Sequence, residues 1–106
     1  MKKAYWISYD LGVGGDYPHL YQWLDDHEAV PCGNSVAFLF FNYKSDDPDK
    51  ELLKSLANVK LQPGNIIYVI RKKEGGDKYY GSFLYGKRQS APWTGFGLKA
   101  KDEIDG

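Results

Sequence analysis

The amino-acid sequence predicts one α+β domain, and three observations lead to this prediction. The chain has 106 residues, which is enough for one hydrophobic core and too few for two. Five segments either alternate between apolar and polar residues or are rich in aromatic and β-branched residues, which is typical of strands. Two further segments repeat apolar residues at helical spacing. Because 42% of the residues are hydrophobic and 16% are aromatic, the chain has ample material for that core.

The first strand and the first helix are predicted on either side of a glycine-rich loop. Residues 4–10 alternate between two faces over the length of a strand. Residues 12–15 interrupt this pattern, and Asp16 is placed to cap a helix that has Pro18 in its first turn. The apolar stripe of this helix consists of Tyr17, Leu20, Tyr21 and Leu24.

Three further strands are expected between the first helix and the turn of the last hairpin. Residues 29–32 form a short edge strand, because Pro31 cannot donate a ladder hydrogen bond. Residues 35–43 and 66–70 are apolar on both faces, which is typical of strands that are covered on both sides. The turn at residues 75–77 then leads into a fifth strand.

The order of the elements predicts a particular fold. A second helix starts at Pro48, and its apolar stripe consists of Leu52, Leu53, Leu56 and Val59. The fifth strand covers residues 78–85. The order is that of the ferredoxin-like split βαβ fold, a sheet with helices packed on it, with an appended fifth strand. Residues 1–88 form this domain. Residues 89–106 are a C-terminal extension that packs on the sheet or on a partner, and the sequence allows a short polar helix at the end of this extension.

The two-sided apolar strands predict a homodimer. Two helices cover only one face of such a sheet, so another layer is needed on the second face. A second copy, packed sheet against sheet or edge to edge about a two-fold axis, supplies that layer. In the alternative, residues 89–106 fold back over the face. The residues expected in the core or in the dimer interface are Phe38, Leu39, Phe40, Phe41, Ile67 and Val69.

The overall composition limits the partners and the location. The 14 basic and 14 acidic residues cancel, so no net charge draws the chain to nucleic acid or to an anionic membrane. No apolar run reaches the roughly 18 residues of a membrane span, and no signal-peptide pattern is recognisable at the start. A single cysteine cannot form an internal disulfide. We therefore expect a cytoplasmic protein without a membrane partner.

The charges are nevertheless sorted along the chain. Residues 4–43 carry five acidic and no Lys or Arg side chains, whereas residues 60–88 carry seven basic and two acidic ones. Tyr79 and Tyr80 lie in this basic region and are candidates for stacking on nucleic-acid bases. The alternative is that the lysines protect an exposed edge strand from aggregation. The candidates for contacts with RNA or DNA phosphates are Arg71, Lys72, Lys73, Lys78, Lys87 and Arg88.

Asp10 is the candidate residue for metal chemistry. It ends the first strand just before the glycine-rich loop, where its carboxylate could hold a divalent cation. Two copies of Asp10 near a two-fold axis could share one ion. The alternative is a turn residue that accepts hydrogen bonds from nearby amides. His19 and His27 are eight residues apart, which does not match a zinc motif, and no nucleotide-binding or hydrolase motif is present.

Three segments resemble a known family. Residues 5–11 (YWISYDL), a helix with Tyr21 and Leu24, and residues 34–38 (NSVAF) resemble the small dimeric CRISPR-associated protein that accompanies the spacer integrase. Within that superfamily the chain is most similar to a branch of small bacterial proteins described as SinR-like. A Gly-aromatic-Gly step such as residues 95–97 also recurs in this branch.

The resemblance implies a ferredoxin-like homodimer in which Asp10 occupies the place of the metal-binding and catalytic aspartate. It also implies Mg²⁺-dependent cleavage of RNA or DNA. The resemblance identifies no general base beside Asp10, and His19 is a candidate only because it is near Asp10 in the sequence. Relatives that bind a nucleic-acid duplex carry Arg and Lys around the first loop and helix, whereas this chain has glycines and acidic residues there. Whether the chain is an enzyme therefore stays open. The alternative function is a non-catalytic homodimeric module that binds proteins.

Overall fold

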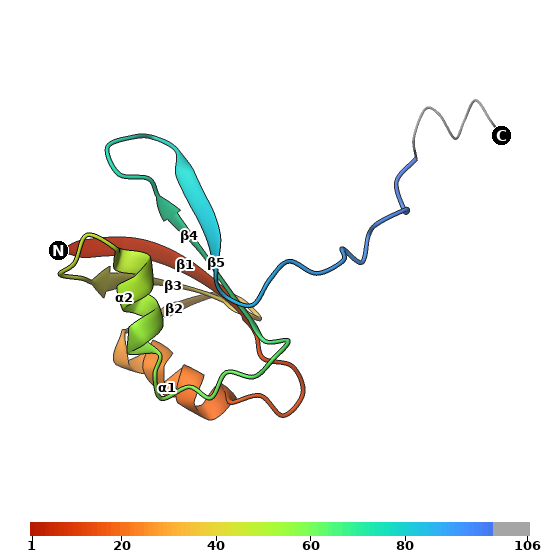
Figure 1. Ribbon diagram of the computed structural model, residues 1–106, viewed down its shortest axis with the longest axis horizontal. Helices are drawn as coiled ribbons and strands as arrows, with labels where there is room; N and C mark the ends of the chain where they lie inside the picture. Colours follow the sequence, from red (N-terminus) through yellow and green to blue (C-terminus); the bar gives the residue numbers. More distant parts are fainter. Residues whose placement is uncertain (99–106) are drawn as a thin grey trace.

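The computed structural model describes residues 1–98 and shows a five-stranded sheet with two helices on one of its faces (Figure 1). This arrangement confirms the predicted α+β class. The short polar helix suggested for the end of the chain lies outside the described residues. The elements in chain order are β1 (Lys2–Asp10), α1 (Tyr17–Asp26), β2 (Val30–Gly33), β3 (Val36–Asn42), α2 (Pro48–Ser55), β4 (Ile66–Lys72) and β5 (Tyr79–Tyr85).

The strand order in the sheet is β2-β3-β1-β4-β5, and each neighbouring pair is antiparallel. β1 is therefore central, whereas β2 and β5 form the two edges. The edge position of β2 confirms the prediction made from Pro31, which pairs only on its inner side with Ala37. At the level of single residues, Trp6 of β1 lies between Phe38 of β3 and Ile70 of β4.

Both helices begin where an aspartate precedes a proline-containing first turn. The Asp16 side chain accepts a hydrogen bond from the His19 amide at the start of α1, and Asp47 accepts one from the Lys50 amide at the start of α2. These bonds satisfy amides that the helix itself leaves without partners. The two predicted helix starts are thereby confirmed.

The hydrophobic core lies between the sheet and the two helices. On the sheet side it contains alternate residues of the central strands. On the helix side it contains Leu20, Trp23 and Leu24 of α1, Leu52 of α2, and Leu56 and Val59 just after α2. Two members of the predicted stripes, Tyr21 and Leu53, do not belong to this core, and Tyr21 is 52% exposed. Leu39, Phe41, Ile67 and Val69, which the sequence placed in the core or in an interface, belong to this core. Its largest fully buried side chains are those of Tyr5, Ile7, Leu11, Leu20, Leu39, Leu52, Ile67 and Val69.

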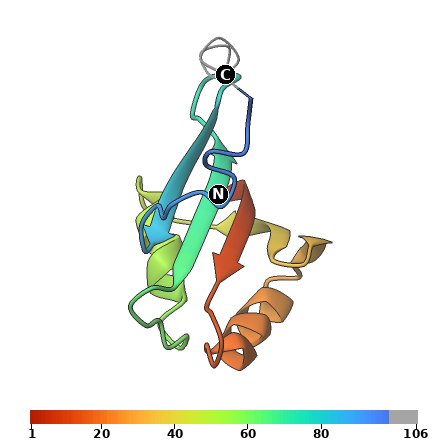
Figure 2. The same ribbon diagram turned by 90° about the vertical axis from the view of Figure 1, so that its right-hand side faces the viewer.

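Residues 89–98, named the arm below, run away from the sheet after β5 (Figures 1 and 2). Gly86 makes this exit possible, because its φ of 83° suits glycine and a Cβ there would collide with the Asn65 carbonyl oxygen. The side chains of Trp93, Phe96 and Leu98 are 73%, 85% and 88% exposed. The arm is thus apolar and makes little contact with the rest of the chain.

Candidate functional site

The face of the sheet that faces away from the helices is the main candidate site. Figure 2 shows that neither helix covers it. Its side chains belong to the strand positions that alternate with those of the core. Most are half-buried by their neighbours, and Phe40 is 56% exposed. We name this surface the open face, and its large side chains are Trp6, Phe38, Phe40, Tyr68, Ile70, Tyr79 and Phe83.

The aromatic rings of the open face contact one another across the strands. The Trp6 ring lies 5.0 Å from Phe38 and 5.9 Å from Tyr79, measured between ring centroids. Phe38 lies 5.3 Å from Phe40 in an edge-to-face arrangement. Such pairs hold the rings in fixed orientations even though water reaches them. The open face is therefore a preformed apolar surface.

Charged groups border the open face on the β5 side. The Arg88 guanidinium lies 5.4 Å from the Phe83 ring centroid, a cation–π distance, and Tyr68 packs edge-to-face against the same Phe83 ring. Lys72 pairs in register with Tyr79 at the far end of β4. A partner on this face would meet aromatic rings in the middle and positive charge along this border.

Asp10 lies at the end of β1 and is exposed. Its Oδ1 accepts a hydrogen bond of 2.9 Å from the Gly12 amide, a short contact within the loop that follows the strand. Among residues 1–98 no three His, Cys, Asp or Glu side chains come together as a metal-binding group. Mg²⁺ prefers six oxygen ligands, and Asp10 supplies one carboxylate. Because Mg²⁺ usually keeps several waters and takes only one or two protein carboxylates, Asp10 stays a predicted ligand.

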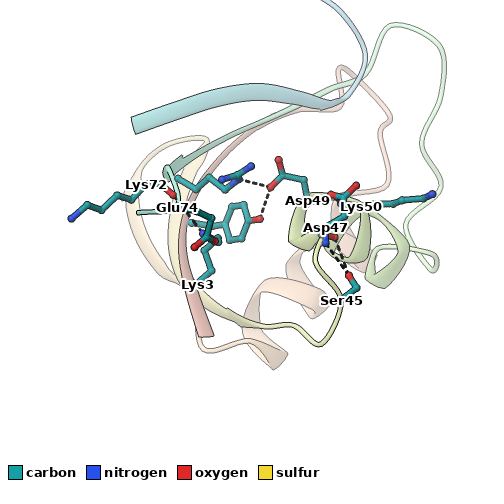
Figure 3. A network of polar contacts seen from close by, with 9 residues as sticks. Lys3, Ser45, Asp47, Asp49, Lys50, Lys72 and Glu74 are labelled. Atoms are coloured by element: carbon teal, nitrogen blue, oxygen red, sulfur yellow. Dashed lines mark hydrogen bonds and ion pairs between the residues drawn. The ribbon is translucent and has the colours of Figure 1, made fainter. Parts of the chain in front are cut away.

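Arg71 of the basic hairpin is bound by a carboxylate of the helix layer. Its Nε donates a hydrogen bond of 2.8 Å to Oδ1 of Asp49 on α2 (Figure 3). Its guanidinium lies 5.0 Å from the Tyr80 ring centroid. Burial lowers the pKa of Arg71, but the hydrogen bond to Asp49, together with the charge of Asp49 and of other nearby groups, outweighs burial and raises that pKa. Arg71 thus links β4 to α2 on the helix side of the sheet.

The other basic candidates lie at the two ends of the hairpin. Lys72, Lys73 and Lys78 are exposed near its turn, and Lys87 and Arg88 are exposed where the chain leaves β5. Within residues 1–98 none of these five side chains forms an ion pair.

Glu74, in the hairpin turn, forms an ion pair with Lys3 of β1, a contact that lowers the pKa of Glu74 (Figure 3). The turn therefore carries one neutralised acid, Glu74, and one acid without an ion pair among the described residues, Asp77, beside three lysines that are likewise without one. The charge that this end of the hairpin presents to a partner is positive.

The two tyrosines expected to stack on bases lie on opposite faces. Tyr79 contacts Trp6 on the open face, whereas Tyr80 contacts Arg71 on the helix side. This separation follows from the strand period of two, because neighbouring residues point to opposite sides. The structure therefore brings only Tyr79 to the aromatic surface.

His19, considered as a base because it is near Asp10 in sequence, is paired with Asp16 instead. Its Nδ1 lies 2.9 Å from a carboxylate oxygen of Asp16. Asp16 also accepts a hydrogen bond of 2.8 Å from the Lys60 amide, and that bond and the contacts with His19 lower the pKa of Asp16. Through the bond from Lys60, Asp16 links the start of α1 to the loop before β4.

Two parts of the site were not singled out from the sequence. Trp6, Tyr68 and Phe83 belong to the open face, and their alternation with buried neighbours was the available signal. The contact between Tyr5 and Asp49 was not foreseen either. The Tyr5 hydroxyl donates a hydrogen bond of 2.5 Å to Oδ1 of Asp49, and burial, followed by this bond, raises the pKa of Tyr5 far above its usual value (Figure 3).

Comparison of the sequence with family models and curated proteins, and of the structure with solved structures, gave no match. Among the described residues no helix has the length and apolar character needed to cross a membrane.

Proposed function

We propose that the chain is a ferredoxin-like homodimer that acts as a binding module, with the open face as the contact between its two copies. The observation that carries the proposal is the aromatic open face, which neither helix covers. The strand order β2-β3-β1-β4, with both helices on one face, supports the ferredoxin-like assignment, and β5 is the appended strand.

The size and composition of the open face suit a protein interface. Six of its seven large side chains are aromatic, and such a side chain can bury about 150–250 Å². Since most of these side chains are already half-buried, they supply only part of the roughly 800 Å² per partner of a standard interface. An isologous contact needs a patch that complements itself, which a flat aromatic surface provides.

A charge placed on the open face tests the dimer. Phe40→Asp puts a carboxylate among the exposed rings, whereas Val13→Asp adds the same charge in the fully exposed loop after β1. We expect the unaltered chain and Val13→Asp to be dimers by light scattering and Phe40→Asp to be a monomer. Because Phe40 is exposed, both variants should keep the circular-dichroism spectrum of the native fold. A monomeric unaltered chain at high micromolar concentration would refute the proposal.

Nucleic-acid binding is a second candidate function, supported by the three hairpin lysines without an ion pair among residues 1–98 and by the family resemblance. Replacing Lys72, Lys73 and Lys78 together by Gln should weaken binding about tenfold or more at low salt, since each phosphate contact releases counterions. The control replaces Lys44, Lys50 and Lys54, exposed around α2, in the same way.

The measurement is fluorescence anisotropy with labelled single- and double-stranded RNA and DNA at several salt concentrations. Equal affinity of the two triple variants would show that the hairpin is not the contact surface. Undetectable binding of the unaltered chain at low salt would leave the protein-binding module as the function.

Magnesium-dependent cleavage rests on the family resemblance alone, and Asp10 is the residue that tests it. Asp10→Ala should abolish any cleavage of labelled RNA or DNA in Mg²⁺ while the dimer remains intact. Cleavage that persists in this variant would exclude Asp10 as the catalytic residue.

A further inference from the structure

The outer edge of β3 is only partly covered by β2. β2 pairs with residues 36–38 of β3, and within residues 1–98 no strand lies beside residues 39–42 on that side. We name residues 39–42 the β3 slot. The unpaired edge of a sheet can accept a further strand through its backbone groups.

The backbone of two residues in the β3 slot is directed away from the sheet. The Tyr43 amide donates a hydrogen bond to the Met1 carbonyl oxygen beside β1. In an antiparallel pair, successive residues direct their N–H and C=O groups to opposite sides of the strand. The odd-numbered residues of β3 therefore bond to β1, and Phe40 and Asn42 direct their donors and acceptors outward, where an added strand can use them.

The two edge strands are protected against such pairing, whereas the β3 slot is not. β2 contains Pro31, which has no N–H, and its pairing with β3 shifts register between Pro31 and Gly33. β5 lies between Lys78 and Lys87, and its pairing with β4 also shifts register. The β3 slot, with the sequence Leu-Phe-Phe-Asn, has no charge, no proline and no shift in its pairing with β1. It is thus the stretch of edge that is best suited to accept a strand.

A hollow of about 410 Å³ adjoins the β3 slot, and its lining differs between the two sides of the sheet. Phe38 and Phe40 line it on the side of the open face, whereas Asp26 and Glu28 line it on the helix side, at the end of α1 and just after it (Figure 1). In the described part of the chain neither acid forms an ion pair. The lining also contains Lys2, so the two acids leave an excess of negative charge.

This lining selects the side chains of a strand that binds in the slot. Successive side chains of a strand point to opposite faces of the sheet. Alternate residues of an added strand therefore lie beside the aromatic rings, and the residues between them lie beside the acids. Apolar residues suit the first set of positions, and lysine or arginine suits the second.

We propose that the β3 slot binds an extended segment of a partner protein in which apolar and basic residues alternate. The segment adds to β3 as a strand and bonds to the backbone of Phe40 and Asn42. This inference rests on the proposed role as a binding module and names the class of its partner. It does not require the second copy, because the slot opens at the edge of the sheet and the proposed dimer contact lies on its face.

The backbone contact is tested with a fluorescent, capped hexapeptide in which lysine and valine alternate. Asn42→Pro removes an outward N–H without breaking a bond to β1, and Asn42→Ala keeps that N–H. By fluorescence anisotropy on the full chain, we expect Asn42→Ala to bind like the unaltered chain and Asn42→Pro to bind about tenfold more weakly. Circular dichroism checks the fold of both variants. Methylation of alternate backbone nitrogens of the peptide should weaken binding in the same way, and it leaves the protein unchanged.

The charge contact is tested by reversing it. Asp26→Lys combined with Glu28→Lys should bind a hexapeptide of alternating glutamate and valine several-fold more tightly than the lysine peptide, which is the opposite of the unaltered chain. The control combines Asp46→Lys with Asp77→Lys, which changes the net charge equally at exposed sites elsewhere. This control should still prefer the lysine peptide.

Glu28 also allows binding to be separated from folding. Its φ of 55° lies in the left-handed region, and the bonds from the Glu28 amide to the Asp25 carbonyl and from the Ala29 amide to the Leu24 carbonyl end α1 in a turn that usually has glycine at this position. Glu28→Gly should therefore resist urea at least as well as the unaltered chain and bind the lysine peptide several-fold more weakly. Unchanged binding in this variant would exclude Glu28 from the slot.

Hydrogen exchange followed by NMR shows where the peptide binds. The amides of Phe40 and Asn42 should exchange more slowly when the lysine peptide is present. If both amides are already protected without it, the arm or a second copy occupies the slot and the proposal is overturned. Equal affinity for the two peptides, or binding that Asn42→Pro leaves unchanged, would also overturn it. A dimer by light scattering that binds neither peptide would overturn the slot alone, and a monomer that binds the lysine peptide there would overturn the homodimer alone.

Discussion

At the scale of single residues, Asp49 is the side chain on which the polar contacts between helix and sheet converge. It accepts hydrogen bonds from the Tyr5 hydroxyl of β1 and from Nε of Arg71 on β4. We predict that Asp49→Ala lowers the free energy of unfolding by about 2 kcal/mol, because it leaves a buried hydroxyl and a largely buried cation without their acceptor. Urea denaturation followed by circular dichroism measures the loss.

The matched control is Asp46→Ala, which removes an exposed carboxylate two residues before α2. It should change stability by no more than about 0.5 kcal/mol. If both variants are equally stable, Asp49 makes no net contribution through these contacts.

The same residues show how far the sequence predicts the structure. The alternation of residues 4–10 placed Tyr5 on one face, and the helix start predicted at Pro48 placed Asp49 in the first turn of that helix. Their contact joins positions 44 residues apart. Local rules of propensity and capping act within a few residues, so they do not determine which elements meet.

At the scale of elements, the loop between β3 and α2 is held by one carboxylate. Glu51 of α2 accepts hydrogen bonds from the backbone amides of Ser45 and Lys44, and these bonds lower the pKa of Glu51. A carboxyl group whose pKa is lower in the folded chain stabilises the fold above its unfolded pKa of about 4.3, and this contribution is lost as the pH falls through the folded value.

We therefore predict that Glu51→Gln lowers stability at pH 7 and weakens the dependence of stability on pH below about 4.5. The measurement is urea denaturation of both proteins between pH 3 and pH 7. The control is Glu28→Gln, an exposed residue whose side chain makes no hydrogen bond to the other described residues. If Glu51→Gln has the same free energy of unfolding as the unaltered chain at every pH, the role given to Glu51 is contradicted.

The elements themselves were the most predictable part of the chain. Both helix starts follow from an aspartate next to a proline-containing turn, and the edge position of β2 follows from Pro31. The basic hairpin was less predictable, because its cationic residues looked alike in sequence. Only the fold shows that Arg71 is bound by Asp49 while Lys72 and Lys73 point into solvent.

At the scale of the whole molecule, the sequence predicted a surplus of apolar surface and the structure shows where it lies. Phe38 and Phe40 were placed in the core or in an interface together with Leu39 and Phe41, and the sheet divides the four by parity. Leu39 and Phe41 face the helices, and Phe38 and Phe40 face outward. What covers the outward pair depends on a second molecule, which a single chain does not contain, so the homodimer stays a prediction.

Thermal unfolding over a range of protein concentrations tests that prediction independently of light scattering. If folding and dimer formation are coupled, dilution favours unfolded monomers, so the Tm of the unaltered chain should rise by several degrees across a hundredfold increase in concentration. Phe40→Asp should unfold at a lower temperature that does not change with concentration, because it leaves only the stability of one subunit. Val13→Asp should follow the unaltered chain. A Tm that stays constant for the unaltered chain while Phe40→Asp unfolds at the same temperature would mean that the open face contributes nothing to the stability of the native protein.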